Sequence, residues 1–298
     1  MQYNIGDGTC HEILQGIYGN EIKIKTNLVL IPLGTANALY HSTHSSSTLD
    51  KDSVDYKLLS IKSYLSKQSS YLNLNTANVY IDDKPHQIGH VVVSTAVHAA
   101  LLHRSEELRQ TDNSINRFKT AFSEVCKHWT QGTVSLSGCR SYDVNKMKFN
   151  DDQQDITLDG PFTYLLATAQ VDRLEEKFVI APNAVSVKGL TIVIVRPLRN
   201  PKVKQLYENG KLYDAVNEAA NDLTKVMFKA YENGEHLKIT NENSQFTVEF
   251  FNAQQLAFKS KSNDGHNEDY VCVDGSLTKL NKEFAVQLND SNLLKLIL

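Results

Sequence analysis

Long apolar runs and paired cysteines are both missing from this 298-residue sequence. No uninterrupted apolar stretch approaches the ~20 residues that a membrane-spanning helix needs, and the N-terminus lacks the charged-then-apolar order of a signal peptide. The four cysteines stand far apart, which is typical of free thiols in a reducing compartment and not of a disulfide framework or a zinc site. We therefore expect a cytoplasmic protein without a transmembrane segment, which contacts membranes only peripherally.

A large excess of charge is missing as well. The formal net charge is -3, and no block of lysine and arginine is interleaved with aromatic residues, so the sequence does not predict binding to nucleic acid. A hydrophobic content of 41% and a charged content of 22% are typical of a globular protein. No internal repeat recurs at a fixed period, so a repeat architecture is not expected.

The first 85 residues predict alternating helices and strands. Residues 9–12 have the Thr-x-x-Glu spacing of a capping box, and the apolar residues after them favour a helix that ends at Gly19. Residues 28–31 form a short apolar run, which is typical of a strand buried on both faces. Pro32 and Gly34 interrupt this run, and a second helix is expected from Ala36.

The rest of the chain predicts mostly strands. Phe118, Phe122 and Val125 have helical spacing, and a second helix is expected from Leu212 to Met227. A polar segment, residues 145–159, precedes the strand candidates. These are residues 162–169, 178–181, 190–196, 246–251, 270–273 and 284–288. We therefore expect a fold of class α/β + β, with a small α/β lobe in residues 1–85 and a larger β-rich lobe, an antiparallel sandwich or barrel, in residues 86–298.

Two glycine-containing loops are the candidate ligand-binding segments. Residues 6–9 read Gly-Asp-Gly-Thr before the first predicted helix, and residues 32–37 read Pro-Leu-Gly-Thr-Ala-Asn before the second. Glycine allows a ligand to approach the backbone closely, and a helix N-terminus attracts phosphate. Asp7 could act as a base or hold a cation. Each loop alone could also be an ordinary turn, but both follow consecutive strands, at the sheet edge where ligands bind in α/β folds.

These loops resemble two motifs of the diacylglycerol, sphingosine and ceramide kinases. Residues 6–16 are similar to that family's Gly-Asp-Gly-Thr signature, and residues 32–37 are similar to its second nucleotide loop. Residues 105–109 (Ser-Glu-Glu-Leu-Arg), the Arg-Phe pair at 117–118 and the Val-Asp-Gly of residues 273–275 are similar to further segments of the family, in the same order. The resemblance implies a Rossmann-like lobe and a β-sandwich lobe, with ATP and lipid meeting between them.

The resemblance also implies roles for individual residues. Asp7 would be the general base that accepts the proton of the lipid hydroxyl, and Mg²⁺ would accompany ATP. Arg109 and Arg117 would stabilise phosphate charge. The residues that would line the nucleotide are Gly6, Gly8, Thr9, Gly34, Thr35 and Asn37. No metal ligand can be named.

Several positions depart from the family pattern. Only five residues precede Gly6, so we expect the leading strands and the family's Asn-Pro-x-x-Gly loop to be missing, and the first third of the chain to be poorly stable. Ala36 replaces a glycine, and Ser276 stands where the late motif has glutamate. The acidic residue that receives the lipid head group in sphingosine kinases has no counterpart here. His98 could take its place, although a histidine in an apolar run is more often a core residue.

These departures leave alternatives open. The chain could be an ATP-dependent kinase that phosphorylates a hydroxyl of a diacylglycerol, ceramide or sphingoid-type lipid at a membrane surface, active or inactive in this form. It could instead be a non-catalytic relative that binds lipid or a protein partner. A nicotinamide nucleotide kinase shares the Gly-Asp-Gly-Thr segment but not the later motifs. The sequence predicts neither the lipid nor the oligomeric state.

Overall fold

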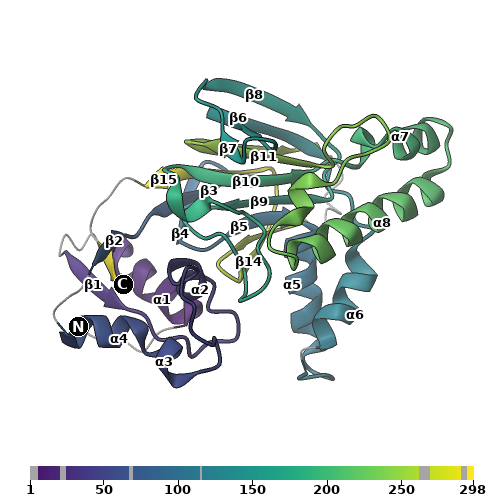
Figure 1. Cartoon of the computed structure of the whole chain (residues 1–298). Coiled ribbons are helices and arrows are strands. Elements are labelled where there is room, and N and C mark those ends of the chain that lie inside the picture. Colours follow the sequence, from purple (N-terminus) through teal and green to yellow (C-terminus); the bar gives the residue numbers. More distant parts are fainter. Residues whose placement is uncertain (1–5, 21–24, 67–69, 115, 262–268, 290–293) are drawn as a thin grey trace.

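The computed structural model describes residues 6–20, 25–66, 70–114, 116–261, 269–289 and 294–298. These residues form a small α/β lobe and a larger lobe built on a curled antiparallel sheet (Figure 1). The predicted fold class, a partial α/β lobe followed by a larger β-sandwich lobe, is confirmed. The first five residues of the predicted α/β lobe lie outside the described residues.

The small lobe contains a three-stranded sheet whose middle strand comes from the C-terminus of the chain. In this sheet β16 pairs in parallel with β1 and antiparallel with β2. Within the described residues, β16 is the only strand that pairs with β1. The elements of the lobe are α1 (Asp7–Gly19), β1 (Thr26–Val29), α2 (Ala38–Thr43), α3 (Val54–Lys57), α4 (Leu59–Ser66), β2 (Tyr71–Asn73) and β16 (Leu294–Ile297).

The two sheets divide the chain differently from the expected boundary near residue 85. The strands β3 (Thr76–Ile81) and β4 (Lys84–Gly89) precede or span that position, yet β3 pairs with β15 (Glu283–Asn289) of the large sheet. Conversely, β16 returns to the small lobe after the large sheet is complete. Strand pairing over more than two hundred residues brings these segments together.

In the part of the chain that the structure describes, the large sheet has 13 strands and folds over itself into two layers. The long strand β6 joins the layers, because its first half pairs with β12 and β8 and its second half pairs with β11 and β7. One layer contains β3, β4, β15, β12 (Gln255–Ser260), β6 (Gly132–Asp143) and β8 (Gln154–Asp159). The other contains β11 (Val248–Ala253), β10 (Leu190–Val195), β9 (Tyr164–Thr168), β5 (Val93–Ala96), β13 (Tyr270–Val273) and β14 (Ser276–Lys279), and β7 (Lys148–Phe149) pairs at the edge.

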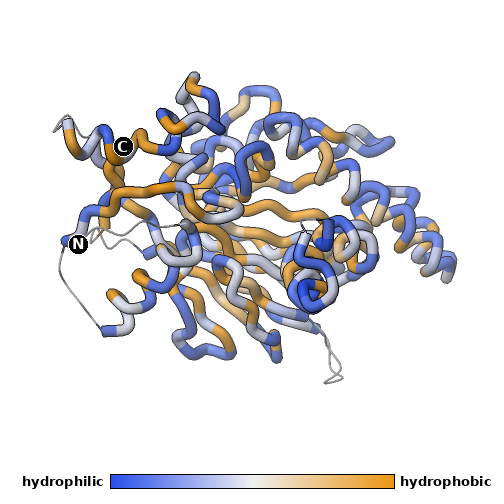
Figure 2. The backbone as a smooth tube through the Cα atoms, turned by 90° about the horizontal axis from the view of Figure 1, so that it is seen from below, coloured by the Kyte–Doolittle hydropathy of each residue, from blue (hydrophilic) through white to orange (hydrophobic). Residues whose placement is uncertain are grey.

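The central strand β10 shows where the two cores lie. All six of its residues are buried, and Ile192 and Ile194 point into the core between the sheet layers. Val193 and Val195 point to the other side, where one continuous apolar cluster contains residues of α8 and of the small lobe, including Leu296. Burial on both faces explains the uninterrupted apolar run of β10. Figure 2 shows apolar segments concentrated along the inner strands and hydrophilic segments on the outer helices.

The described helices α5 to α8 lie outside the sandwich. The helices α5 (Val97–Leu108) and α6 (Asn116–Val125) form a hairpin that projects from the large lobe, and α8 (Leu212–Ala230) covers the outer face of β9 and β10 after the shorter α7 (Pro201–Glu208). Single 3₁₀ turns lie at Ala184–Ser186, Pro197–Arg199 and Glu235–Lys238. None of the helices in the described ranges combines the length and the apolar content needed to cross a membrane.

Three local predictions are wrong. The first helix begins at Asp7 with Gly6 as its N-cap, so Thr9 lies within the first turn and forms no capping box with Glu12. Residues 178–181 form buried turns and no regular strand, although Ile180 belongs to the core. The polar segment 145–159 contains β7 and β8, whose side chains face solvent on one side.

Because β16 is the middle strand of the small sheet, we expect Leu296→Ala to destabilise the small lobe. Leu296 is fully buried in the shared apolar cluster, so its truncation leaves a cavity that costs about 2–5 kcal/mol. Lys295→Ala on the same strand is the control, since Lys295 is exposed and its replacement should cost less than about 0.5 kcal/mol. Denaturant unfolding measures both, and equal losses would contradict the central role of β16.

Candidate functional site

Asp7 joins the two glycine-containing loops. Its Oδ2 accepts a hydrogen bond of 2.7 Å from the Ala38 amide, and its Oδ1 accepts one of 3.2 Å from the Leu39 amide. These amides belong to the first turn of α2, where backbone N–H groups have no partner within the helix. Asn37, the residue that precedes α2, makes no capping bond. A carboxylate from the first loop therefore caps the helix that follows the second loop.

The second loop closes on itself through Asn37. The Asn37 side chain accepts a 2.8 Å bond from the Gly34 amide and donates a 2.7 Å bond to the Gly34 carbonyl. Asn37 is buried and has a positive φ of 50°, a conformation that asparagine tolerates. A Cβ atom at Gly6 would lie 3.0 Å from the Gly34 backbone, so the two loops are in direct backbone contact.

The outer surfaces of both loops are open to a ligand. Gly8, Thr9, Gly34 and Thr35 are exposed, and a Cβ atom at Gly8 would meet nothing within 4 Å. The first-turn amides of the 13-residue helix α1 carry the positive end of its dipole at the same place. A small hollow lies between the loops and is lined by Gly6, Asp7, Cys10, Leu30, Asn37, Leu39 and Tyr40. The arrangement can receive an anionic group beside a carboxylate.

The Asp7 carboxylate is held in a poorly hydrated place. Burial raises its pKa above the usual 3.8, whereas the positive charge of His90 and the amides of Ala38 and Leu39 act in the opposite direction. The net effect is a raised pKa. A carboxylate with this property is more basic than a solvated one, as proton acceptors in active sites often are.

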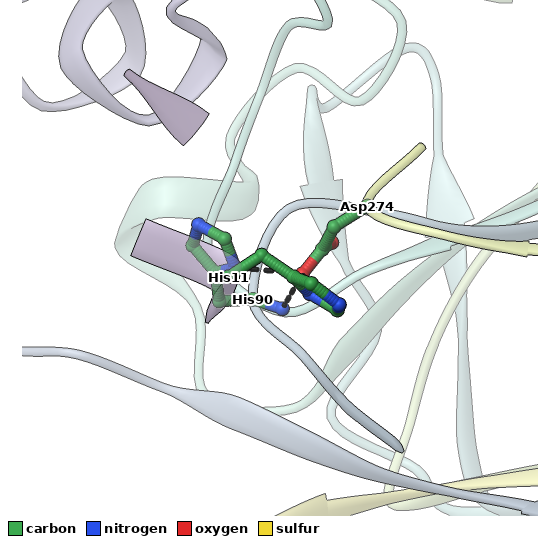
Figure 3. A group of neighbouring side chains, drawn as sticks. All are labelled: His11, His90 and Asp274. Atoms are coloured by element: carbon green, nitrogen blue, oxygen red, sulfur yellow. Dashed lines mark hydrogen bonds and ion pairs between the residues drawn. The ribbon is translucent and has the colours of Figure 1, made fainter. Parts of the chain in front are cut away.

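A second aspartate, Asp274, lies in the turn between β13 and β14 and is surrounded by hydrogen-bond donors. His90 Nδ1 donates to its Oδ2 over 2.6 Å and His11 Nδ1 over 3.0 Å (Figure 3). The amides of His90, Val91 and Val92 donate to the same carboxylate over 2.8–2.9 Å. We call Asp274, His11 and His90 the Asp274 cluster. Since a carboxylate only accepts, each imidazole must carry a proton on Nδ1.

The Asp274 cluster is an ionic group in the protein interior. The side chains of Asp274 and His90 have no exposed surface, and that of His11 is 10% exposed. Burial raises the pKa of Asp274, but the charge of His90 and the bonds from both histidines outweigh it and hold that pKa far below its usual value. Burial lowers the pKa of His90, but the Cys10 thiol and the Asp274 carboxylate raise it well above 6.5. Both shifts favour the charged form of each group.

The Asp274 cluster also connects the lobes. His11 belongs to α1 of the small lobe, while His90 and Asp274 belong to segments of the large lobe. A second connection lies one turn along α1, where Gln15 donates a 2.7 Å bond to the Ile88 carbonyl and accepts a 3.0 Å bond from the Ile88 amide. Gln15 thus pairs with the edge of β4 as a neighbouring strand would. These contacts fix α1, and hence the first loop, against the large lobe.

The remaining residues of interest lie away from the loops. Arg109 pairs with Glu106 over 3.3 Å, and Arg117 donates to carbonyl groups at the beginning of α6, so each bonds locally near the end of the α5–α6 hairpin. Figure 1 shows that this end is separated from α1 and α2. His98 is buried at the start of α5, where Ser94 bonds its Nδ1 over 2.6 Å, and burial lowers its pKa to about 4.

Sequence reasoning brought the two loops together but missed the Asp274 cluster as a unit. Asp274 was part of a motif similar to the late Asp-Gly-Glu of lipid kinases, which is the signal that could have indicated it. His11 lies inside the first motif without being singled out. His90 follows Gly89 and belongs to no motif, so only the fold reveals it.

Comparison with known proteins finds similarity to the same family that the two loops resemble. Residues 5–68 match the family model of the diacylglycerol kinase catalytic domain. A diacylglycerol kinase structure from Bacillus anthracis str. Sterne is 13% identical, with a TM-score of 0.53 over 99% of this chain and 75% of that chain. A candidate diacylglycerol kinase from the same organism is 15% identical, with a TM-score of 0.55 over 99% of this chain and 76% of that chain. No curated protein sequence matches the chain. At these identities, the structures establish a shared fold.

The contact between the loops predicts opposite effects for two glycine substitutions. Gly6→Ala places a methyl group 3.0 Å from the Gly34 backbone, which should cost about 1–3 kcal/mol of unfolding free energy. In Gly8→Ala the added methyl group has no atom within 4 Å, and the position lies in a helix, where alanine is favoured over glycine. This substitution should leave the unfolding free energy unchanged or raise it by up to about 1 kcal/mol. Thermal unfolding measures both changes. A Gly6→Ala protein as stable as Gly8→Ala would show that the loops do not touch.

Asp274→Asn should destabilise the protein in a pH-dependent way. Loss of the buried charge should cost about 3 kcal/mol or more. The lowered pKa of Asp274 makes its contribution present above pH 3.8 and lost as the pH falls. The raised pKa of His90 makes its contribution complete below pH 6.5 and lost as the pH rises. The difference between wild type and variant should therefore be largest from about pH 4 to 6.5.

Denaturant unfolding across pH 4–9 provides the measurement, and Asp82→Asn provides the control. Asp82 lies in the β3–β4 turn and accepts hydrogen bonds of 3.2 Å from the backbone amides of Lys282 and Glu283. Neither of these partners is a histidine. The contribution of Asp82 should not decline above pH 6.5. The same decline in both variants would rule out the imidazolium as its cause.

Proposed function

We propose that this chain, whose residues 5–68 belong to the diacylglycerol kinase catalytic domain family, is a lipid kinase that transfers the terminal phosphoryl group of ATP to a lipid hydroxyl. The observation that carries the proposal is the contact of the two loops through Asp7. It presents exposed glycines, a helix N-terminus and a carboxylate of raised pKa at one place. The acceptor would be a diacylglycerol, ceramide or sphingoid-type lipid met at a membrane surface.

Nucleotide binding is assigned to the open side of the loops. Backbone amides at the start of α1 and the exposed Gly8, Thr9, Gly34 and Thr35 would face the phosphates, because amides and a helix dipole favour negative charge there. Gly6 and Asn37 would act indirectly by shaping the loops, since the Asn37 side chain is buried and bonds both backbone groups of Gly34. Arg109 and Arg117 would reach phosphate only if the α5–α6 hairpin approached the loops, and His98 would meet a lipid head group only if its buried ring became accessible.

Asp7 is the proposed proton acceptor. Each of its oxygens uses one lone pair for an amide of α2 and keeps another for a substrate hydroxyl. Burial makes the carboxylate more basic, which favours removal of the hydroxyl proton as the oxygen attacks phosphorus. The rest of the catalytic effect would come from positioning of the two substrates, as is usual for phosphoryl transfer.

Magnesium, when bound with ATP, would neutralise phosphate charge. The described residues around the loops do not fit a magnesium site of their own. Asp7 keeps a free lone pair on each oxygen but could supply only one carboxylate, and the Asp274 carboxylate already has five donors. Ser276 stands where the related kinases have glutamate. The contribution of this chain is therefore to bind the nucleotide, orient the acceptor and accept a proton.

Transfer of radiolabelled phosphate from ATP to diacylglycerol, ceramide and sphingoid bases in mixed micelles tests the proposal. We expect one class of lipid to be labelled, and Asp7→Asn to reduce kcat by about 100-fold or more. Asp82→Asn is the matched control, because Asp82 also accepts two backbone amides but lies at the β3–β4 turn. Its activity should remain unchanged.

Two results would refute the proposal. Equal activity of Asp7→Asn and Asp82→Asn, with both variants folded, would remove Asp7 as the base. Failure to label any lipid, while lipid still binds, would favour a non-catalytic relative that uses the same fold for binding. The replacement of the late glutamate by Ser276 and the use of Asp7 as a helix cap are the features that favour this second reading.

A further inference from the structure

A large cavity lies between the two lobes and shares no lining residue with the hollow at the glycine-containing loops. Its volume of about 760 Å³ lies within the range of cavities that hold small molecules. From the small lobe it is lined by residues 71–73 of β2 and by Lys295 of β16. From the large lobe it is lined by Gln170, residues 185–188 and Asn289 at the end of β15. A molecule in this cavity would therefore touch both lobes.

The cavity lies near the end of the small sheet that is opposite to the loops. The second loop follows the C-terminal end of β1, where Val29 is paired with Ile297. Asn75 also lines the cavity and comes directly after Leu74, whose amide donates a 3.0 Å bond to the carbonyl of Leu294 at the other end of β16. Both passages of the chain between the sheets are at this end, because β2 continues into β3 and β16 follows β15. An occupant would therefore lie beside the connections between the lobes and away from Asp7.

One side chain that lines the cavity is buried and has an unused donor. Gln170 is 3% exposed, and its Oε1 accepts a 2.9 Å hydrogen bond from the Asn75 amide. This bond fixes the orientation of the side-chain amide, because a backbone N–H can donate only to the oxygen. The Nε2 group makes no hydrogen bond within the described residues. A buried donor without a partner is costly, so Nε2 needs an acceptor that enters the cavity.

The charge around the cavity indicates which kind of acceptor fits. Lys295 lines it from the small lobe and Lys188 from the large lobe, and none of the described lining residues is acidic. Two ammonium groups together with an amide donor favour an anion, and lysine commonly binds phosphate as a point charge. The side chains of Leu72, Val185 and Val187 add apolar surface to the same cavity. A small molecule with an anionic group and a less polar part matches this lining.

We propose that the cavity between the lobes binds the phosphomonoester group of a small molecule, with Gln170, Lys188 and Lys295 donating hydrogen bonds to its oxygens. The site is separate from the loops that are assigned to ATP, so the proposal does not rest on the proposed function. Because donors come from both lobes, the bound molecule would stabilise their arrangement, as any ligand of the folded state does.

Ordered water is the competing explanation for the cavity. The cavity is polar and large enough for water, and a water molecule could accept from Gln170 Nε2. Water does not require a positive charge, whereas a phosphomonoester does. The two explanations therefore differ in what removal of a lysine charge should do.

Isothermal titration calorimetry of the full chain with glycerol 3-phosphate tests the proposal, with and without a non-hydrolysable ATP analogue. Lys295→Gln should weaken binding by about tenfold or more, because it removes a charged donor. Gln170→Glu should weaken it at least as much, since it keeps the acceptor for the Asn75 amide and replaces the donor with a negative oxygen. Lys259→Gln is the matched control, because Lys259 is also exposed on a strand but does not line the cavity.

Vesicles of phosphatidylcholine with and without phosphatidic acid distinguish a lipid head group from a soluble phosphomonoester. If the ligand is a lipid, sedimentation with the phosphatidic acid vesicles should depend on Lys295. If it is soluble, only the calorimetric affinity should depend on it. Both results support the site.

Three results would overturn the proposal. The first is equal affinity of Lys295→Gln and Lys259→Gln in both assays, which would leave the cavity to water. The second is the absence of binding by both ligands. The third is binding that disappears when the ATP analogue is added, which would place the phosphate at the loops. Binding that depends on Lys295 in a protein that phosphorylates no lipid would support the cavity site and refute only the proposed function.

Discussion

The burial of the Asp274 carboxylate is the constraint on which the arrangement of the lobes depends. A carboxylate without exposed surface is stable only if donors surround it, and here they come from two other segments of the chain, α1 and the β4–β5 connection. The turn that carries Asp274 has positive φ values at Asp274 and Gly275, which turn the side chain back toward the segment of His90. Satisfying this one group fixes the β13–β14 turn, the β4–β5 connection and α1 relative to one another.

The same physical requirement operates on a smaller scale between the loops. The first turn of α2 needs acceptors for its amides, and its own N-cap residue, Asn37, is turned back to Gly34. Asp7 supplies the acceptors from a position 31 residues earlier in the chain. Because Gly6 and Gly34 lack side chains, the backbones can come close enough for this bond. The motif glycines therefore serve packing as well as access for a ligand.

The sequence predicted the parts of the fold that local composition determines. The strands β9 and β10 were recognisable because nearly continuous apolar runs reflect burial on both faces. The strands β4 and β8 were missed, since their many exposed positions resemble loops in sequence. No local pattern indicates that β16 returns to the small lobe, because that pairing depends on contacts far apart in the chain.

The candidate site was predictable to a similar extent. Asp7 and the glycines were found because they occupy short motifs whose chemistry is visible in the residues themselves. The capping box at Thr9 was a correct local pattern that did not form, since contact with Gly34 makes Gly6 the N-cap. His90 was not predictable, because its importance comes from burial beside Asp274 and not from its neighbours in the sequence.

The two aspartates show how one site can hold carboxylates with opposite properties. Asp274 has five donors and a charged partner, so its pKa is lowered and it stays ionised as a fixed negative group. Asp7 has only two amides and a poorly hydrated environment, so its pKa is raised and it is the more basic of the two. Pairs of titratable groups with divergent environments often mark a division between a reactive group and a supporting one.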